Sequence, residues 1–228
     1  MLQRNEVQKQ FVSEEPGDVF KVRMTDVGGF QRRLVVQGSP YLSKEFKDAK
    51  WIAKGQFEKK VKMRYDAYRD NIQLIQNGKQ SLLVKAKDVE AEIDGKLYQY
   101  IDYLDHDNLK SGYFTPLNEG KTLLFSRTAM IIIPPRMPEN GYEFVQPAKF
   151  EAKTIHYIKR SGKTATPLQD LSRKEVLAVL WDKYSELRTY ARKNKLRLRT
   201  EAEVIRVLEY YDSLKTEENQ EELQESVD

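Results

Sequence analysis

The sequence predicts an α+β fold: a large antiparallel β-meander, folded over as a sandwich or an open barrel, followed by a C-terminal helical hairpin. Apolar and polar residues alternate from Val61 to Ala67, which is the period of a half-buried strand. Turns that contain glycine recur between such runs. Beyond Pro167 the apolar residues change to helical spacing. The pattern therefore places the strands first and the helices last.

We expect four segments along the chain. They are a lead-in of uncertain order (1–17), an antiparallel β domain (18–167), a helical hairpin packed on it (168–214) and an acidic disordered tail (215–228). The tail has one Lys against five Glu and one Asp, whereas the whole chain carries a formal charge of +4. The body is therefore strongly basic. The tail is typical of a solvated, unfolded segment because it has almost no apolar residues to bury.

Hairpin turns divide the β domain. Asp94-Gly95 separates two alternating runs, and a two-residue type I′ turn needs positive φ at both central positions. The apolar phase inverts across residues 68–71, so we expect a tight turn or a bulge there that sets the strand register. The same Gly-Lys turn chemistry recurs at Gly78, Gly95, Gly120 and Gly162.

The helical hairpin is predicted from two capping boxes, at residues 172–175 and 200–203. In each box the hydroxyl accepts from a first-turn amide while the Glu side chain reaches back. Apolar residues then recur at helical spacing as far as Asn194 in the first helix and Leu214 in the second. We expect residues 195–199 to join two helices whose apolar faces pack on each other or on the sheet.

The composition excludes several classes of site. Cysteine is absent, so disulfides, thiolate metal sites and cysteine nucleophiles are excluded. The longest purely apolar run, from Ala129 to Ile133, is too short to span a bilayer. Residues 1–10 are polar and lack the apolar core of a signal peptide. We therefore expect no transmembrane segment.

Three strings resemble a group of Bacteroidota cell-envelope or secreted proteins that has no assigned activity. They are Gly38-Ser-Pro-Tyr-Leu42, RYDAYRDNIQL from Arg64 to Leu74, and KNKLRLRTEAEVIRVLEYYDSL from Lys193 to Leu214. The resemblance covers roughly residues 38–214 in the same order. It implies a periplasmic or secreted protein, which would make Met1 an added initiator of a mature chain. It carries over no functional residues.

No enzyme signature survives inspection. Ser161-Gly162-Lys163-Thr164 ends like a phosphate-binding loop, but the required upstream glycine is replaced by Tyr157. A hairpin turn is therefore the better interpretation. There is no nucleophile elbow, two-histidine metalloprotease helix or dinucleotide fingerprint. We predict that the chain is not an enzyme, with an unrecognised hydrolase built from scattered carboxylates as an alternative.

A cluster of potential ligands lies in one loop, at Asp102, Asp105, His106 and Asp107. Oxygen and imidazole ligands suit divalent metals, but the spacing of a calcium-binding loop is not met. We interpret this segment as a solvated loop between strands. The other histidine, His156, has no partner motif and fits an ordinary strand position. We predict no metal site and no cofactor.

The candidate interaction surface is aromatic. Tyr98 and Tyr100 share one face of a predicted strand, and Tyr68 lies in the same meander. If this face is exposed, it suits a protein or glycan partner, because tyrosine is enriched at interfaces. If it is covered by the C-terminal helices, it is a core face. We expect a non-enzymatic binding or structural protein of the bacterial cell envelope that acts through this aromatic face.

A basic segment between the two helices gives the alternative function. It comprises Arg192, Lys193, Lys195, Arg197 and Arg199. Such a cluster can bind nucleic acid or an anionic surface, with Tyr190 available to stack on a base. The competing interpretation is that the cations stabilise a helix C-terminus and face water while Leu196 and Leu198 turn inward. On this interpretation nucleic acid is disfavoured as a partner.

Overall fold

The computed structural model describes residues 19–25, 31–53, 57–138 and 144–225. The lead-in predicted at 1–17 lies outside these residues. The strands are β1 (Val19–Thr25), β2 (Gln31–Gln37), β3 (Lys47–Ala53), β4 (Phe57–Asp66), β5 (Asn71–Gln76), β6 (Lys79–Leu82), β7 (Val89–Ile93), β8 (Lys96–Asp105), β9 (Asn108–Pro116), β10 (Leu123–Ile133), β11 (Ala148–Lys159) and β12 (Thr166–Pro167). The helices are α1 (Arg173–Val179), the 3₁₀ turn η1 (Trp181–Lys183), α2 (Tyr184–Lys193) and α3 (Glu201–Glu225).

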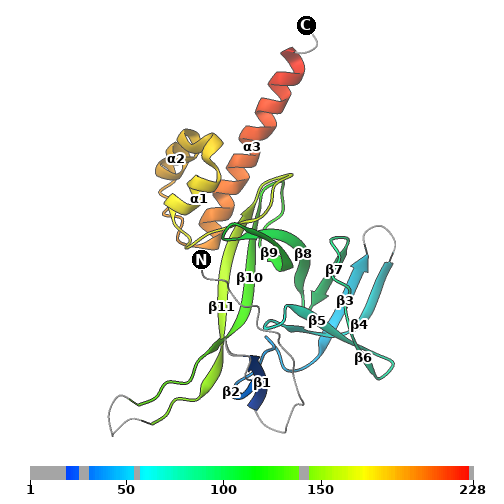
Figure 1. Ribbon diagram of the computed structural model, residues 1–228. Coiled ribbons are helices and arrows are strands. Elements are labelled where there is room, and N and C mark those ends of the chain that lie inside the picture. Colours follow the sequence, from blue (N-terminus) through cyan, green and yellow to red (C-terminus); the bar gives the residue numbers. More distant parts are fainter. Residues whose placement is uncertain (1–18, 26–30, 54–56, 139–143, 226–228) are drawn as a thin grey trace.

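The strands form one open sheet in the order β1-β2-β11-β10-β9-β8-β7-β3-β4-β5-β6, with β12 beside β11. Pairing is antiparallel apart from a short parallel contact between β2 and β11. The α+β prediction, a meander followed by helices, is confirmed. We call β3–β9 the meander lobe and β10–β11 the long hairpin (Figure 1). The two meet at β9, which pairs with β8 over most of its length but with β10 at only Thr115 and Pro116.

The turn between β4 and β5 accounts for the inverted apolar phase. Asp66 is fully buried, and its Oδ1 accepts from the backbone N–H groups of Tyr68 (3.1 Å) and Arg69 (2.9 Å). Asp70 then takes a left-handed conformation at φ 56°, so that Tyr65 pairs with Ile72 across the hairpin. The predicted tight turn is confirmed.

The turn between β7 and β8 is also as predicted. Ile93 pairs with Lys96, which leaves Asp94 and Gly95 as the two central residues. Their φ angles are 51° and 75°, the positive values that a type I′ turn needs. The local sequence therefore specifies this hairpin.

The predicted first helix is interrupted. The Ser172 hydroxyl accepts from the N–H of Glu175 as expected, but α1 ends at Val179 and a 3₁₀ turn separates it from α2. At the break, the Asp182 carboxylate accepts from Arg160, just after β11, and from Tyr211 of α3. The single helix expected as far as Asn194 is therefore replaced by α1, η1 and α2.

The last helix continues beyond the predicted end at Leu214. α3 extends to Glu225, and its outer half projects away from the other elements (Figure 1). The expectation of a disordered tail was therefore wrong for residues 215–225. Lys215 binds both Asp182 (2.9 Å) and Glu218 (3.0 Å), and Lys183 also contacts Glu218, so the first turn beyond Leu214 is tied to η1.

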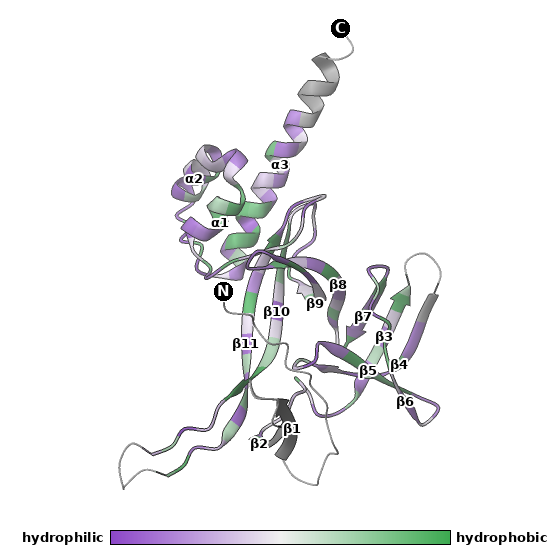
Figure 2. Cartoon of the chain, viewed as in Figure 1, coloured by the Kyte–Doolittle hydropathy of each residue, from purple (hydrophilic) through white to green (hydrophobic). Residues whose placement is uncertain are grey.

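The helices cover one end of the long hairpin. Hydrophobic residues colour parts of α1 and the lower half of α3 green (Figure 2), and apolar side chains of these helices pack with those of the sheet. The core there contains Leu124 and Ile158 of the sheet with Leu177, Leu187 and Leu208 of the helices. A separate core fills the meander lobe. Among the described residues, none of the helices is long and apolar enough to cross a membrane.

Candidate functional site

The predicted tyrosine surface lies mostly inside the meander lobe. Tyr98 is only 7% exposed, and its ring centroid is 5.1 Å from that of Tyr65. Tyr100 is half-buried against Tyr113, with the ring centroids 5.2 Å apart. Burial raises the pKa of Tyr98 to about 12. The Tyr98/Tyr100 face is therefore a core face, and the curled sheet covers it rather than the C-terminal helices.

Tyr68, the third residue of that predicted surface, lies apart from the other two. It is half-buried, and its ring packs edge-on against Phe150 of β11, with the centroids 5.3 Å apart. The structure thus does not bring the three tyrosines together on one open face. Tyr68 lies in the turn after Asp66, where its N–H donates to Asp66 Oδ1, and this turn places the ring beside the long hairpin.

A buried polar centre, which the sequence did not indicate, joins the meander lobe to the long hairpin. Asp70 Oδ1 accepts from the Tyr65 hydroxyl (2.6 Å) and from the N–H of Tyr113 (3.2 Å), and Arg127 lies 3.4 Å from Asp70 Oδ2. Burial lowers the pKa of Arg127, but Asp70 and the neighbouring tyrosines together outweigh burial and leave that pKa raised. Both side chains are largely enclosed, so this centre holds the fold together.

The basic segment is exposed as one patch. All five cations, Arg192, Lys193, Lys195, Arg197 and Arg199, face solvent, and none forms an ion pair with another described residue. Leu196 and Leu198 between them are buried, as the competing interpretation predicted. The structure therefore confirms the geometry of that interpretation, while the cations remain available to an external anion.

The acidic side chains beside the basic segment are occupied elsewhere. Glu203 accepts from the backbone N–H groups of Arg197 (3.2 Å) and Arg199 (2.9 Å), which lowers its pKa. Glu201 lies 2.7 Å from the imidazole of His156. Tyr190, which we expected to be available for a base, stacks on Tyr210 with centroids 4.0 Å apart. The backbone of the basic segment is thus anchored by Glu203, and this carboxylate forms no ion pair with the five cations.

The predicted loop of potential ligands is mostly strand: Asp102 and Asp105 lie in β8, and only His106 and Asp107 form the turn to β9. Asp102 accepts from Ser111 and contacts Lys87, and Asp105 contacts Lys110 and His106. Hydrogen bonds from Lys87 and Lys110 lower the pKa values of Asp102 and Asp105, respectively. In the part of the chain that the structure describes, no group of three or more metal-ligating side chains converges. At Ser161 to Thr164, the Lys163 N–H donates to the Arg160 carbonyl, which makes this segment a hairpin turn.

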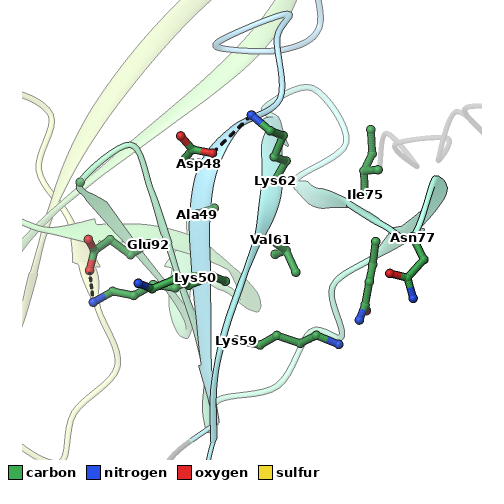
Figure 3. A pocket seen from close by; sticks show the side chains of 12 residues that line it. Asp48, Ala49, Lys50, Lys59, Val61, Lys62, Ile75, Asn77 and Glu92 are labelled. Carbon is green, nitrogen blue, oxygen red and sulfur yellow. Dashed lines mark ion pairs between the residues drawn. The ribbon is translucent and has the colours of Figure 1, made fainter.

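A large hollow lies beside β3 and β4, and sequence reasoning missed it (Figure 3). Its volume is about 880 Å³. It is lined by four lysines, Lys50, Lys59, Lys60 and Lys62, and by the apolar residues Ala49, Val61 and Ile75. Lys59 and Val61 point toward the end of β5, where Asn77 also lines the hollow (Figure 3). A volume of this size is in the range of ligand-binding sites.

The hollow exists because β5 leaves β4 early. β4 pairs with β3 from Phe57 to Met63, but with β5 only from Lys62 to Asp66. Among the described residues, no strand therefore pairs with the β5-facing side of residues 57–61. We call this stretch the open edge of β4. Its backbone N–H and C=O groups face the hollow, where they can pair with an added strand.

The charges in the hollow are only partly compensated. Lys50 lies 3.2 Å from Glu92, and Lys62 lies 3.3 Å from Asp48. Lys59 and Lys60 form no ion pair with any residue whose side chain the structure describes. The walls thus offer ammonium groups to an acidic ligand. The alternating run that predicted β4 gave no sign of this, because an open edge depends on where the neighbouring strand diverges.

No protein-family model, curated protein or solved structure matches this chain. The resemblance of the three strings to Bacteroidota proteins therefore stays a prediction.

Proposed function

We propose that the chain is a non-enzymatic binding protein that takes an extended, acidic peptide segment along the open edge of β4. The observation that carries this proposal is the coincidence of an unpaired strand edge with a lysine-lined hollow. Edge strands with free backbone groups accept an added strand, and backbone hydrogen bonds supply affinity while side chains supply selectivity. The binding surface that we propose is therefore the open edge of β4, and not the aromatic face predicted from the sequence.

The lining of the hollow indicates the chemistry of the peptide. Side chains of an added strand alternate between the two faces of the sheet. Lys59 lies on the same face as Val61, whereas Lys60 and Lys62 lie on the other. An acidic residue on either face would therefore meet an ammonium group, and apolar residues would contact Val61 or Ile75. A peptide that alternates glutamate and valine satisfies both requirements.

Fluorescence anisotropy with such a labelled peptide tests the proposal. We expect saturable binding that weakens on the order of tenfold in a Lys59→Glu/Lys60→Glu variant, because like charges then face the acidic side chains. A peptide that alternates lysine and valine should not bind. The same acidic peptide, N-methylated at alternate residues, should also fail, because it cannot donate to the edge of β4.

The matched control is Lys174→Glu, which reverses an exposed lysine on α1 far from the hollow. It changes the net charge of the chain in the same direction but should leave peptide affinity unchanged. Equal weakening by Lys174→Glu would show a nonspecific charge effect. Unimpaired binding of the N-methylated peptide would rule out strand addition.

The basic segment supports a second candidate function, the binding of nucleic acid or an anionic lipid surface. The supporting observation is that five exposed cations lack ion pairs with described residues while neighbouring Glu201 and Glu203 are occupied. Binding to single-stranded DNA or anionic vesicles should fall steeply with salt. Lys195→Glu/Arg197→Glu should weaken it on the order of tenfold, since each phosphate contact contributes separately. Salt-independent binding would exclude this candidate.

The location that we propose is the bacterial cell envelope, in the periplasm or outside the cell. It is supported by the resemblance of the three strings and by no structural feature. Fractionation of a native host, with the chain detected by antibody, tests it. Recovery of the chain with cytoplasmic markers would overturn this location without affecting the peptide-binding proposal.

A further inference from the structure

Two cavities adjoin where the helices meet the ends of the strands. The first has a volume of about 410 Å³ and is lined by the β9–β10 turn, the β11–β12 turn, η1 and α3. The second, of about 490 Å³, is lined by β11, β12, α1 and η1. Arg160 and Lys163 line both cavities. These two residues therefore form a wall that the two cavities share.

The first cavity is cationic. Lys121, Arg160, Lys163 and Lys215 line it together with two carboxylates, Asp182 and Asp212. Asp212 is occupied, because its Oδ2 accepts from the backbone N–H groups of Lys121 (2.9 Å) and Thr122 (3.0 Å). The exposed ammonium groups of Lys121 and Lys163 form no ion pair with any described residue. These two groups are left to meet an anion from solution.

Asp182 holds the cationic wall in place. It accepts from Arg160 (3.1 Å), the Tyr211 hydroxyl (2.9 Å) and Lys215 (2.9 Å). Burial raises its pKa, but the hydrogen bonds from Lys215 and Tyr211 outweigh burial, and the pKa is lowered. Its three partners come from the β11–β12 turn and α3, so Asp182 is a structural anchor of this wall.

The second cavity combines apolar side chains with an aromatic rim. Val179, Ala178 and Pro167 line it beside Trp181. Trp181 is 69% exposed, although the next residue, Asp182, is anchored to the sheet and to α3. The indole is therefore held at the mouth of the cavity with much of its ring surface in water. A flat ligand ring that covers it removes apolar surface from water on both partners.

We propose that the two cavities form one site for a small phosphorylated molecule that carries a planar ring, of the size of a mononucleotide. Its phosphate would lie against Lys121, Arg160 and Lys163, which supply charge-assisted hydrogen bonds. Its ring would lie in the second cavity against Trp181. The combined volume falls within the usual range of small-molecule sites. This site is separate from the open edge of β4.

Isothermal titration calorimetry of the full chain with adenosine monophosphate, adenosine and inorganic phosphate tests the site. We expect adenosine monophosphate to bind about tenfold more tightly than either fragment, because only it fills both cavities. Lys163→Gln should weaken both adenosine monophosphate and phosphate about tenfold. Trp181→Ala should weaken adenosine monophosphate and leave phosphate unchanged.

Lys193→Gln in the basic segment is the matched control, and it should not alter these affinities. Lys163 and Trp181 are exposed, so circular dichroism of both variants should match the parent. Undetectable binding of all three probes would overturn the proposal. So would equal affinity for adenosine monophosphate and phosphate, or a Lys163→Gln variant with unchanged affinity. None of these outcomes bears on peptide binding at β4.

Discussion

Asp70 and Arg127 face each other where the meander lobe meets the long hairpin, with Oδ2 of Asp70 3.4 Å from Nη2 of Arg127. The guanidinium lies 4.9 Å from the ring centroid of Tyr103 and 5.7 Å from that of Phe114. The turn between β4 and β5 and the middle of β10 are therefore clamped by one enclosed charge pair.

Replacing Arg127 by Met should destabilise the protein by about 3 kcal/mol, because the Asp70 carboxylate would lose its buried counter-ion. Urea unfolding measures the change. The control is Lys62→Met, which removes one partner of the exposed Lys62–Asp48 pair and should cost about 0.5 kcal/mol or less. Equal stability of Arg127→Met and the parent would show that the pair contributes nothing net.

Gly112→Ala should also be destabilising, by about 2 kcal/mol, because overpacking an enclosed site forces its neighbours to move. A methyl group at Gly112 would lie 2.7 Å from Oδ2 of Asp70 and 3.3 Å from Nε of Arg127. Gly78→Ala is the comparison, since its added carbon meets nothing within 4 Å and only its φ of 72° opposes the change. That variant should cost about 1 kcal/mol. A cost at Gly112 no larger than at Gly78 would contradict the close approach.

The contribution of Asp182 should depend on pH. Its pKa is lowered from an ordinary value of 3.8, so its stabilising effect is fully present above that value and is lost as the pH falls through the lower folded-state pKa. Asp182→Asn should cost about 1–3 kcal/mol at neutral pH. The cost should shrink below roughly pH 4, as measured by urea midpoints across the acid range. A constant cost at every pH would exclude ionisation of Asp182 as its cause.

Lys215→Ala should loosen the outer part of α3. The substitution removes contacts with Asp182 and Glu218 that tie this part of the helix to η1. Amide hydrogen exchange from residue 215 onward should accelerate about tenfold, since local opening then costs less free energy. Arg206→Ala, at an exposed site on the inner part of the same helix, should leave these rates unchanged. Unaltered exchange in Lys215→Ala would mean that the extension is stable by itself.

Local chemistry made several elements predictable. The Asp94-Gly95 turn and the helix starts at Ser172 and Thr200 depend on residues within one turn of each other, and each is present. The helix break at η1 and the extension of α3 were missed, because both depend on contacts of Asp182 or Lys215 with distant segments.

Exposure was less predictable than periodicity. The alternation correctly placed Tyr98 and Tyr100 on one face, but it does not say whether the sheet curls over that face. The open edge of β4 was likewise hidden, since the same residues would form a fully paired strand if β5 stayed alongside. For the basic segment, the sequence did predict exposure, because Leu196 and Leu198 alternate with the cations and are buried.

The narrow pairing between β9 and β10 has a mechanical consequence. Only Thr115 and Pro116 of β9 pair with β10, whereas β8 pairs with β9, and β10 with β11, along most of their length. Under tension applied across the molecule, this seam is where the sheet should tear first. The Asp70–Arg127 clamp and the Met130 N–H bond to the Ala67 carbonyl bridge the same seam. A few scattered backbone and side-chain contacts, and not a continuous ladder, thus transmit force between the two halves.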